Sequence, residues 1–248
     1  MNNIFNKTTL LSVVFAASTQ VAIAQEEENQ SNDLFLNGWQ KQVTLSGLYT
    51  TGNTSQKSLG FSSKFVEDTG PYHQTVTSYF DYNQSNNITD RRRYGLGYKG
   101  DYDLSEKTYV SGFGGYESDS FGAFNKRFTA TAAYGLRVLE DDTFKWSVEA
   151  GPAVLITRVL PISDYETSLT AYGASIFAWN VNERSDISNE TKVFVGNEVV
   201  IENKTAFTVK VSDALSAQLG FDVLYNRDAP IGRKTTDTIT RLGIQYDF

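Results

Sequence analysis

The chain contains one histidine, His73, and no cysteine. Histidine is the side chain most often used to move protons near neutral pH, but hydrolysis also needs a nucleophile or an acid beside it. An enzyme acting on lipid or peptide would therefore require a cluster of Asp, Ser or Tyr around His73, and this is the alternative interpretation. The absence of cysteine removes thiolate chemistry and disulfide bonds. The favoured interpretation is a protein without enzymatic activity.

Two further motifs are typical of bound cofactors or metals. Residues 95–100 read Gly-Leu-Gly-Tyr-Lys-Gly, which fits the dinucleotide fingerprint as a string. The fingerprint works only where a helix follows and its N-terminus faces the pyrophosphate, and here it lies inside an alternating strand pattern. The run Glu140-Asp141-Asp142 offers carboxylates for calcium, but three adjacent acids on a tight turn cannot all point at one ion. We therefore expect no cofactor and no metal site.

The elements that position these residues are predicted to be strands, because side-chain polarity alternates with period two from Trp39 onward. In residues 144–156, for example, Phe144 and Trp146 lie on one parity while Lys145 and Glu149 lie on the other. Side chains of a strand point to opposite faces in turn, so each predicted strand has one apolar and one polar face. Helical spacing is absent.

Twelve such runs are separated by turn-forming Asn, Asp, Gly, Ser and Thr residues. An even number of strands suits an up-and-down barrel with both termini on one side. The registers of the runs near Thr108 and Thr167 are left open, because they alternate poorly. The twelve runs start near Trp39, Lys57, Tyr72, Arg91, Thr108, Arg127, Phe144, Thr167, Asn189, Thr205, Leu215 and Asp237.

The connections between the runs also alternate in character. Those on the side of the termini are predicted to be short turns, and those on the opposite side are longer on the whole, as in outer-membrane barrels. The predicted turns are 67–71, 104–107, 140–143, 182–186 and 212–215, and the predicted loops are 51–56, 84–90, 118–125, 160–165, 198–204 and 227–236.

The N-terminus has the features of an export signal. Lys7 is the only charged residue before Glu26, the apolar run 10–17 follows it, and Ala22-Ile23-Ala24 is a site that signal peptidase accepts. We predict a cleaved signal peptide at residues 1–24, a disordered lead-in at 25–38 and a barrel domain at 39–248. A buried N-terminal helix is the alternative, but the polar stretch that follows would leave it without a docking face.

The C-terminus favours a barrel over a soluble β-sandwich, which also has alternating strands. The chain ends in Gly243-Ile-Gln-Tyr246-Asp-Phe248, which resembles the C-terminal insertion signal of outer-membrane barrels. Together with the export signal, this ending predicts an all-β, transmembrane, antiparallel up-and-down barrel of about twelve strands in the outer membrane of a Gram-negative bacterium. Closure is required because an open sheet edge would leave backbone groups unpaired in hydrocarbon.

A barrel assigns the charged parity to an enclosed aqueous lumen and the apolar parity to lipid. The predicted lumen-facing charges are Arg91, Arg93, Lys99, Asp101, Arg127, Arg137, Lys145, Glu149, Asp222, Arg241 and Asp247. The run Arg91-Arg92-Arg93 lies at the outer end of its strand, where it would either bind lipopolysaccharide phosphates or form a solvated strand mouth.

Composition bounds the partners of the protein. The chain has 29 acidic and 22 basic residues, which argues against nucleic acid, because phosphate binding needs a basic surface. The expected partners are outer-membrane lipid, lipopolysaccharide and the barrel-assembly machinery, which would act on the C-terminal strand. The barrel is expected to be a monomer.

The order of several short segments resembles the salt-induced outer-membrane protein family, which is YdiY-like and contains domain of unknown function 481. The resemblance covers nearly all of the predicted mature chain. Its segments are Val43-Thr-Leu-Ser-Gly47 with Gly52-Asn-Thr54, then Tyr94-Gly-Leu-Gly-Tyr98, Ala150-Gly-Pro152, Asp228-Ala-Pro230 and Thr235-Thr-Asp-Thr238.

The resemblance implies an outer-membrane barrel of unassigned role with a link to salt stress, and it brings no catalytic residues. The combined interpretation is a narrow channel or an envelope-stabilising protein. The alternatives are a barrel enzyme and a soluble periplasmic β-domain that binds a small ligand.

Overall fold

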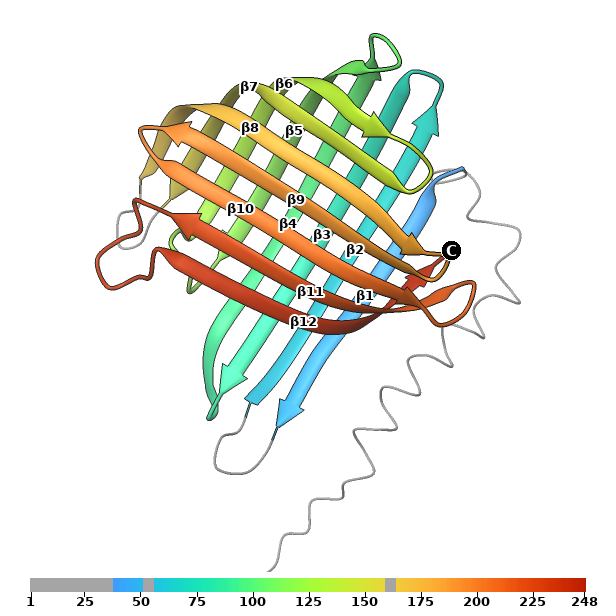
Figure 1. Cartoon of the computed structure of the whole chain (residues 1–248). Coiled ribbons are helices and arrows are strands. Elements are labelled where there is room, and N and C mark those ends of the chain that lie inside the picture. The colour runs from blue at the N-terminus through green and yellow to red at the C-terminus, as the bar shows by residue number, and fades with distance from the viewer. Residues whose placement is uncertain (1–37, 51–55, 159–163) are drawn as a thin grey trace, which may run out of the picture. The chain divides into compact units, whose positions relative to one another are not determined.

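The computed structural model of the chain describes residues 38–50, 56–158 and 164–248. The predicted signal peptide (1–24) lies outside the described residues, as do nearly all of the lead-in (25–38) and most of the predicted loops 51–56 and 160–165. Residues Gln40–Phe248 form one compact unit, shown as a coloured ribbon in Figure 1.

Twelve strands and no helix occur among the described residues, so none of these residues belongs to a helix long and apolar enough to span a membrane. The strands are β1 (Gln40–Thr50), β2 (Gln56–Thr69), β3 (Tyr72–Ser85), β4 (Ile88–Asp103), β5 (Thr108–Asp119), β6 (Lys126–Glu140), β7 (Phe144–Arg158), β8 (Tyr165–Asn182), β9 (Ser185–Gly196), β10 (Val199–Lys210), β11 (Leu215–Asn226) and β12 (Thr236–Asp247).

The strands close into a single antiparallel barrel in which each strand pairs with the next one in sequence. β1 completes the barrel by pairing with β12, with Leu45 opposite Ile244. Closure leaves every strand paired on both sides, which is what a sheet exposed to hydrocarbon requires. The predicted fold class, an up-and-down barrel of twelve antiparallel strands, is confirmed.

The barrel has two ends, which we name by what they carry. The terminal end holds the start of β1 and the end of β12, and the loop end lies opposite; in Figure 1 the C-terminus marks the terminal end at the right. The terminal end has short turns such as residues 70–71 and 183–184, and the loop end has longer connections such as 120–125 and 227–235. This matches the predicted contrast between turns and loops.

Two loop-end connections are tighter than predicted. The predicted loop 84–90 is a two-residue turn at Asn86 and Asn87, which have φ angles of 49° and 63°. Positive φ at both central residues is typical of a hairpin turn that matches strand twist, and Asn tolerates it. The predicted loop 198–204 was wrong, since only residues 197–198 connect β9 to β10.

The start of β10 was misplaced because its polar residues resemble a loop. Glu202 and Lys204 have the inward parity and Asn203 is paired across the hairpin, so these polar residues belong to the strand. β9 likewise begins at Ser185 rather than near Asn189.

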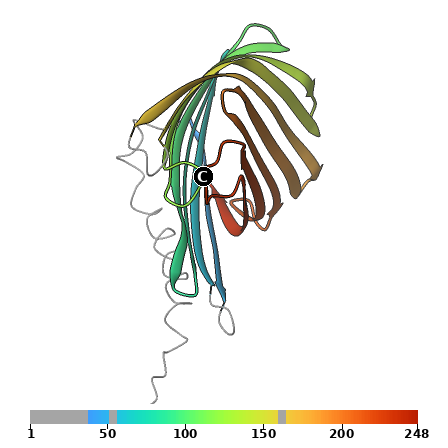
Figure 2. The same cartoon turned by 90° about the vertical axis from the view of Figure 1, so that its left-hand side faces the viewer.

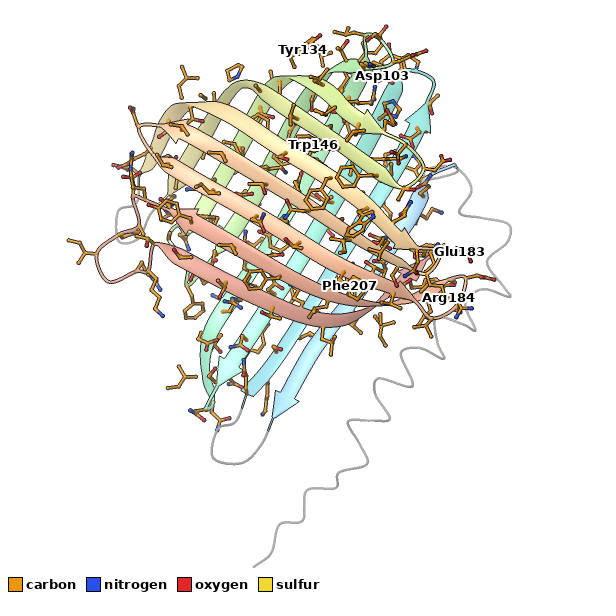
Figure 3. The ribbon with its side chains drawn as sticks, viewed as in Figure 1. Asp103, Tyr134, Trp146, Glu183, Arg184 and Phe207 are labelled. Atoms are coloured by element: carbon orange, nitrogen blue, oxygen red, sulfur yellow. The ribbon has the colours of Figure 1, made fainter. Side chains whose placement is uncertain are left out.

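The apolar parity faces outward. Figure 3 shows the labelled side chains of Tyr134, Trp146 and Phe207 projecting from the outside of the ribbon. Leu96 is 60% exposed and Tyr134 54% exposed, whereas the inward Arg127 is 1% exposed. A β-sandwich would bury its apolar parity against a second sheet, and an exposed apolar band of this extent is instead typical of a membrane surface. This arrangement excludes the sandwich alternative.

Candidate functional site

The inner wall of the barrel combines aromatic rings with glycines of the neighbouring strand. The ring of Tyr79 lies against Gly95, and a Cβ atom on Gly97 would be 2.9 Å from Cε2 of Phe113. Because glycine has no Cβ, each ring lies along the wall rather than across the lumen. The glycines of residues 95–100 therefore provide packing space inside a strand, and no helix follows them to hold a dinucleotide.

Glu149 on β7 is the centre of a buried group of polar side chains. Its carboxylate accepts hydrogen bonds from Lys99 Nζ at 2.7 Å, Tyr109 Oη at 2.9 Å and Tyr172 Oη at 3.0 Å. Lys99 also binds Asp101 at 2.8 Å. Glu149 is 4% exposed, so its charge depends on these partners. The group joins β4, β5, β7 and β8 through the interior.

A second group joins the opposite side of the barrel. Arg241 on β12 donates two bonds to Asp81 on β3, at 2.8 and 2.7 Å, and one to Asp222 on β11 at 2.6 Å. Arg93 binds Glu117 at 2.8 Å nearby. A guanidinium that contacts a carboxylate through two N–H groups fixes both charge and orientation. The Asp81–Arg241 contact holds β3 to β12, which are not neighbours in the sheet, whereas Arg241–Asp222 and Arg93–Glu117 each join adjacent strands.

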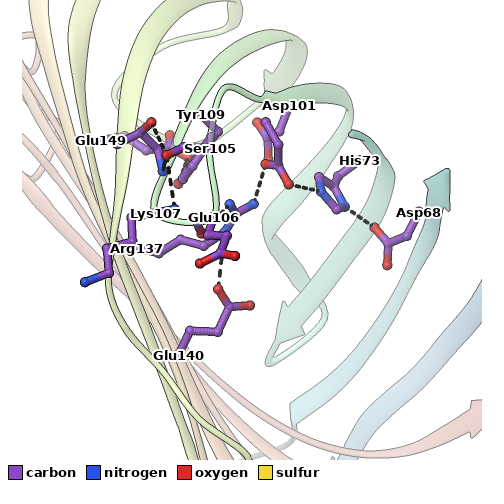
Figure 4. Close-up of polar contacts among 12 residues, drawn as sticks. Asp68, His73, Asp101, Ser105, Glu106, Lys107, Tyr109, Arg137, Glu140 and Glu149 are labelled. Atoms are coloured by element: carbon purple, nitrogen blue, oxygen red, sulfur yellow. Dashed lines mark hydrogen bonds and ion pairs between the residues drawn. The ribbon is translucent and has the colours of Figure 1, made fainter. Parts of the chain in front are cut away.

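His73 lies in a chain of ion pairs near the terminal end, shown in Figure 4. Its Nδ1 is 2.7 Å from Asp68 Oδ1, and its Nε2 is 3.0 Å from Asp103 Oδ2. Asp103 in turn binds Arg137 at 2.6 Å, and Arg137 contacts Glu140 at 3.5 Å. The predicted acids are thus present, but both ring nitrogens already face carboxylates. That leaves no lone pair to accept a proton from a nucleophile.

The sequence prediction of lumen-facing charges did not include four charged residues on the β9–β10 hairpin. Glu190 and Lys192 on β9 lie opposite Lys204 and Glu202 on β10, so the signs alternate both along and across the hairpin. Lys192 binds Glu190 at 3.0 Å. We call these four residues the charge square. The sequence signal for the charge square is the Glu-x-Lys spacing, which occurs at 190–192 and again at 202–204. It was not recognised because residues 198–204 were predicted to form a loop.

The same hairpin is polar on its outward face. Asn189 Nδ2 donates to Thr205 at 2.8 Å, Thr205 to Asn203 at 3.1 Å, Asn203 Nδ2 to Thr191 at 2.7 Å and Thr191 to Asn189 at 3.1 Å. These four bonds form a closed ring, which we call the outer ring. It satisfies polar groups that a barrel wall facing hydrocarbon would otherwise leave without partners.

Opposite walls of the barrel approach each other near the charge square; Figure 2 shows the wall of β1–β5 facing that of β7–β12. A cavity of about 10 Å³ there is lined by Arg93 from β4 together with Glu202, Lys204 and Asp237 from β10 and β12. Lys204 Nζ also lies 5.6 Å from the ring centre of Tyr79 on β3. A space of this size holds about one water molecule. Side chains from β3 and β4 thus come close to side chains from β10 and β12 across the lumen, and we call this place the constriction.

An apolar cluster occupies the lumen nearer the loop end. Phe124, in the connection 120–125, is 2% exposed, and the guanidinium of Arg127 lies 4.2 Å from its ring centre. Arg127 also binds Glu198 at 3.0 Å. The connection therefore folds inward and narrows this end. The cluster consists of Phe124, Ala133, Ala153, Leu155, Tyr172, Ala174, Phe194, Val200 and Leu224.

Most of the charges predicted for the lumen have the inward parity and a polar partner there. Lys145 differs, since it is exposed at the terminal end and no ion pair to it occurs among the described residues. In the predicted C-terminal signal, Gly243 pairs with Ser46, and the rings of Tyr246 and Phe248 stack with centres 5.5 Å apart. The inward charges with a polar partner are Arg91, Arg93, Lys99, Asp101, Arg127, Arg137, Glu149, Asp222, Arg241 and Asp247.

The acidic run 140–142 serves a turn. Asp141 accepts bonds from the backbone N–H groups of Phe144 at 2.6 Å and Thr143 at 2.8 Å, and these bonds hold the pKa of its carboxyl below its usual range. Across the described residues, no group of three or more His, Asp or Glu side chains is placed to hold a metal ion.

Comparison with known proteins gives a family and a fold. The model of a family described as "Protein of unknown function, DUF481" matches residues 43–248. The uncharacterized protein YdiY of Escherichia coli (strain K12) is 22% identical over 205 residues, which cover 81% of this chain and 80% of YdiY.

Among solved structures, the NanC porin is similar with a TM-score of 0.54 and 12% identity, covering 83% of this chain and 100% of NanC. The KdgM porin is similar with a TM-score of 0.45 and 13% identity, covering 85% of this chain and 99% of KdgM. At 12% identity the likeness to NanC concerns the fold alone, which is that of an outer-membrane barrel.

Proposed function

Because the chain belongs to the DUF481 family of proteins of unknown function, we propose its activity from the barrel itself, as a narrow outer-membrane channel for small ions. The observation that carries the proposal is the exposure of three inward side chains at mid-lumen. Lys64, Thr77 and Lys204 have the inward parity near the middle of their strands, and all three are exposed. Water that reaches these side chains occupies the lumen.

The constriction, which Lys204 itself lines, sets the expected size of the channel. Its lining carries both signs of charge, and no ion pair to Glu202 or Lys204 occurs among the described residues. Unpaired charges at a narrow point act on a passing ion more strongly than paired ones. The proposed channel therefore passes small hydrated ions and excludes larger solutes.

Planar-bilayer recording tests the channel. We expect the purified barrel to give small discrete conductance steps. Changing both Lys64 and Lys204 to Glu should shift the permeability ratio toward cations by on the order of tenfold, from the Coulomb energy of a reversed charge a few ångströms away in water. The matched control is Lys57→Glu, an exposed outward lysine on β2, which should leave the reversal potential unchanged.

The absence of steps from a correctly folded barrel would contradict the channel. Folding is checked independently, since a closed barrel migrates faster unboiled than boiled on a denaturing gel. A silent barrel would favour the second candidate, a sealed envelope-stabilising protein, which the apolar cluster at the loop end supports. The link to salt stress rests on the family resemblance and stays a prediction, which protein levels at raised osmolarity test.

The C-terminal strand is proposed to engage the barrel-assembly machinery. Phe248 is 57% exposed and stacks on Tyr246, so its ring is available on the outside of the barrel. Deletion of Phe248 should lower the amount of gel-shifting barrel in the outer membrane severalfold. Phe221→Ala, which removes an exposed outward ring from β11, is the control and should assemble normally. Equal yields of both variants would contradict the role of Phe248.

A further inference from the structure

The run Arg91-Arg92-Arg93 is divided by the alternation of β4. Arg91 and Arg93 point to the lumen, where Arg93 binds Glu117. Arg92 has the opposite parity and is exposed on the outside of the barrel. The sequence therefore offers one outward arginine at the loop end of β4, rather than three.

Two cations from other strands join Arg92 on the outside. Lys126 begins β6 and Arg158 ends β7, and the two are register partners. Both have the outward parity, since their neighbours Arg127 and Thr157 are buried inside. We call Arg92, Lys126 and Arg158 the cation row. It extends across β4 to β7, where adjacent strands are separated by about 4.8 Å.

Backbone bonds from the connection 120–125 hold the row in place. Ser120 N donates to the carbonyl of Arg92 at 3.1 Å, and Asn125 N donates to the carbonyl of Arg158 at 2.8 Å. The Nε and Nη2 groups of Arg92 both bind Ser120 Oγ at 3.2 Å. The spacing of the cations is thus fixed by the same connection that folds Phe124 inward.

The charge of the row is not neutralised by the described part of the chain. No ion pair to Arg92, Lys126 or Arg158 occurs there. The Nε group of Arg158 is also buried, and it has no hydrogen-bond partner among the described residues. Asp90 on β4 lies at a shift of register, and its carboxylate accepts bonds from Asn83 and Ser85, which have the inward parity, so it is on the opposite face of the sheet from Arg92. Three cations side by side repel one another unless an anion lies among them.

An aromatic row lies directly beneath the cation row. Ring centres are 6.2 Å apart for Tyr94 and Tyr116, 4.7 Å for Tyr116 and Phe128, and 6.4 Å for Phe128 and Tyr165. Tyr94 and Phe128 each follow a cation by two residues on the same strand face, which is about 7 Å along a strand. Aromatic girdles mark the membrane interface, so the cations lie at the depth of lipid headgroups.

We propose that the cation row binds the phosphate groups of a phosphorylated glycolipid headgroup, the lipopolysaccharide of the outer leaflet. The guanidinium groups of Arg92 and Arg158 suit bidentate contacts with phosphate oxygens, and Lys126 supplies a point charge between them. The inference relies on the outer-membrane location proposed above, and it is independent of ion conduction.

Binding of fluorescent lipopolysaccharide to the detergent-solubilised full-length barrel tests the site. Changing Arg92, Lys126 and Arg158 together to Gln should weaken binding at least tenfold, because charge-assisted contacts are lost. The matched control changes Lys57, Arg227 and Lys234 to Gln, which removes the same charge from exposed positions near the loop end, and it should change affinity less than twofold. If the triple variant does not give the gel shift of a folded barrel, Lys126→Gln alone replaces it in the binding assay.

Three outcomes would overturn the proposal. Equal losses in the triple variant and its control would indicate attraction by net charge only. Undiminished binding of dephosphorylated lipopolysaccharide would remove the phosphate from the interaction. Displacement by inorganic phosphate at the same phosphate concentration would indicate a site for free anions rather than for a lipid. Bilayer recording of the triple variant separates the two proposals, since its conductance should equal that of the unmodified barrel whether or not lipid binding is lost.

Discussion

Replacing Glu149 with glutamine is expected to destabilise the barrel by about 3 to 5 kcal/mol, the cost of breaking a buried ion pair by removing one partner. Glutamine keeps the shape of the side chain but carries no charge. Among the described residues, Asp101 is then the one acid that forms an ion pair with the ammonium of Lys99. The hydroxyls of Tyr109 and Tyr172 also lose a charged acceptor. The expected result is a lower urea midpoint for loss of the gel-shifting form.

The control and a rescue variant make this expectation specific. Glu166→Gln changes an exposed acid on the neighbouring strand β8 and should leave the urea midpoint unchanged. Combining Glu149→Gln with Lys99→Met and Asp101→Asn should restore much of the stability, because no charge of this group is then left without a partner. If Glu149→Gln were as stable as the original barrel, Asp101 alone would suffice to hold Lys99, and the central role of Glu149 would be wrong.

Gly151→Ala is expected to cost about 3 kcal/mol, near the upper part of the range for overpacking, and to lower the yield of folded barrel. A Cβ on Gly151 would overlap the carbonyl oxygen of Ala132 and would lie 2.7 Å from Cα of Ala133. Both are backbone atoms of β6, so no side chain can rotate away. The strands β6 and β7 would have to separate.

Gly112→Ala is the matched control, since nothing lies within 4 Å of the Cβ that it would add on β5. We expect its urea midpoint and its gel shift to match those of the original barrel. Equal behaviour of the two variants would show that β6 and β7 accommodate the methyl group by a local shift, which would contradict the expected clash.

The sequence was sufficient for the fold because a membrane barrel follows few rules. Alternation assigned Phe144 and Lys145 to opposite faces, and the cost of an unpaired sheet edge in hydrocarbon required the first and last strands to pair. The two chain ends indicated an outer-membrane barrel, and the turn-forming residues indicated where strands end. The rule failed at Glu202 and Lys204, because a strand polar on both faces has no apolar parity to reveal it.

The pairing of the site residues was not predictable from the sequence. Arg241 and Asp81 are 160 positions apart, and their contact depends on how the closed barrel brings β12 and β3 together across its interior. His73 was recognised as the only histidine, but its engagement by Asp68 and Asp103 depends on the turn between β2 and β3 and on the end of β4. The assignment of Arg91 and Arg92 to opposite faces did follow from alternation. The lipid-facing charge is therefore not the run 91–93 on one strand but the cation row, which extends across several strands.

The outer ring has a consequence for how the β9–β10 hairpin finds its alignment. A slip of one position would turn Glu190 and Lys204 toward acyl chains and bring the amides inward, at high cost in hydrocarbon. A slip of two positions would keep the faces but would separate Asn189 from Thr205 and Asn203 from Thr191. The outward side chains of the outer ring thus select one alignment of the hairpin. The hydrophobic pattern of the two strands alone does not determine that alignment.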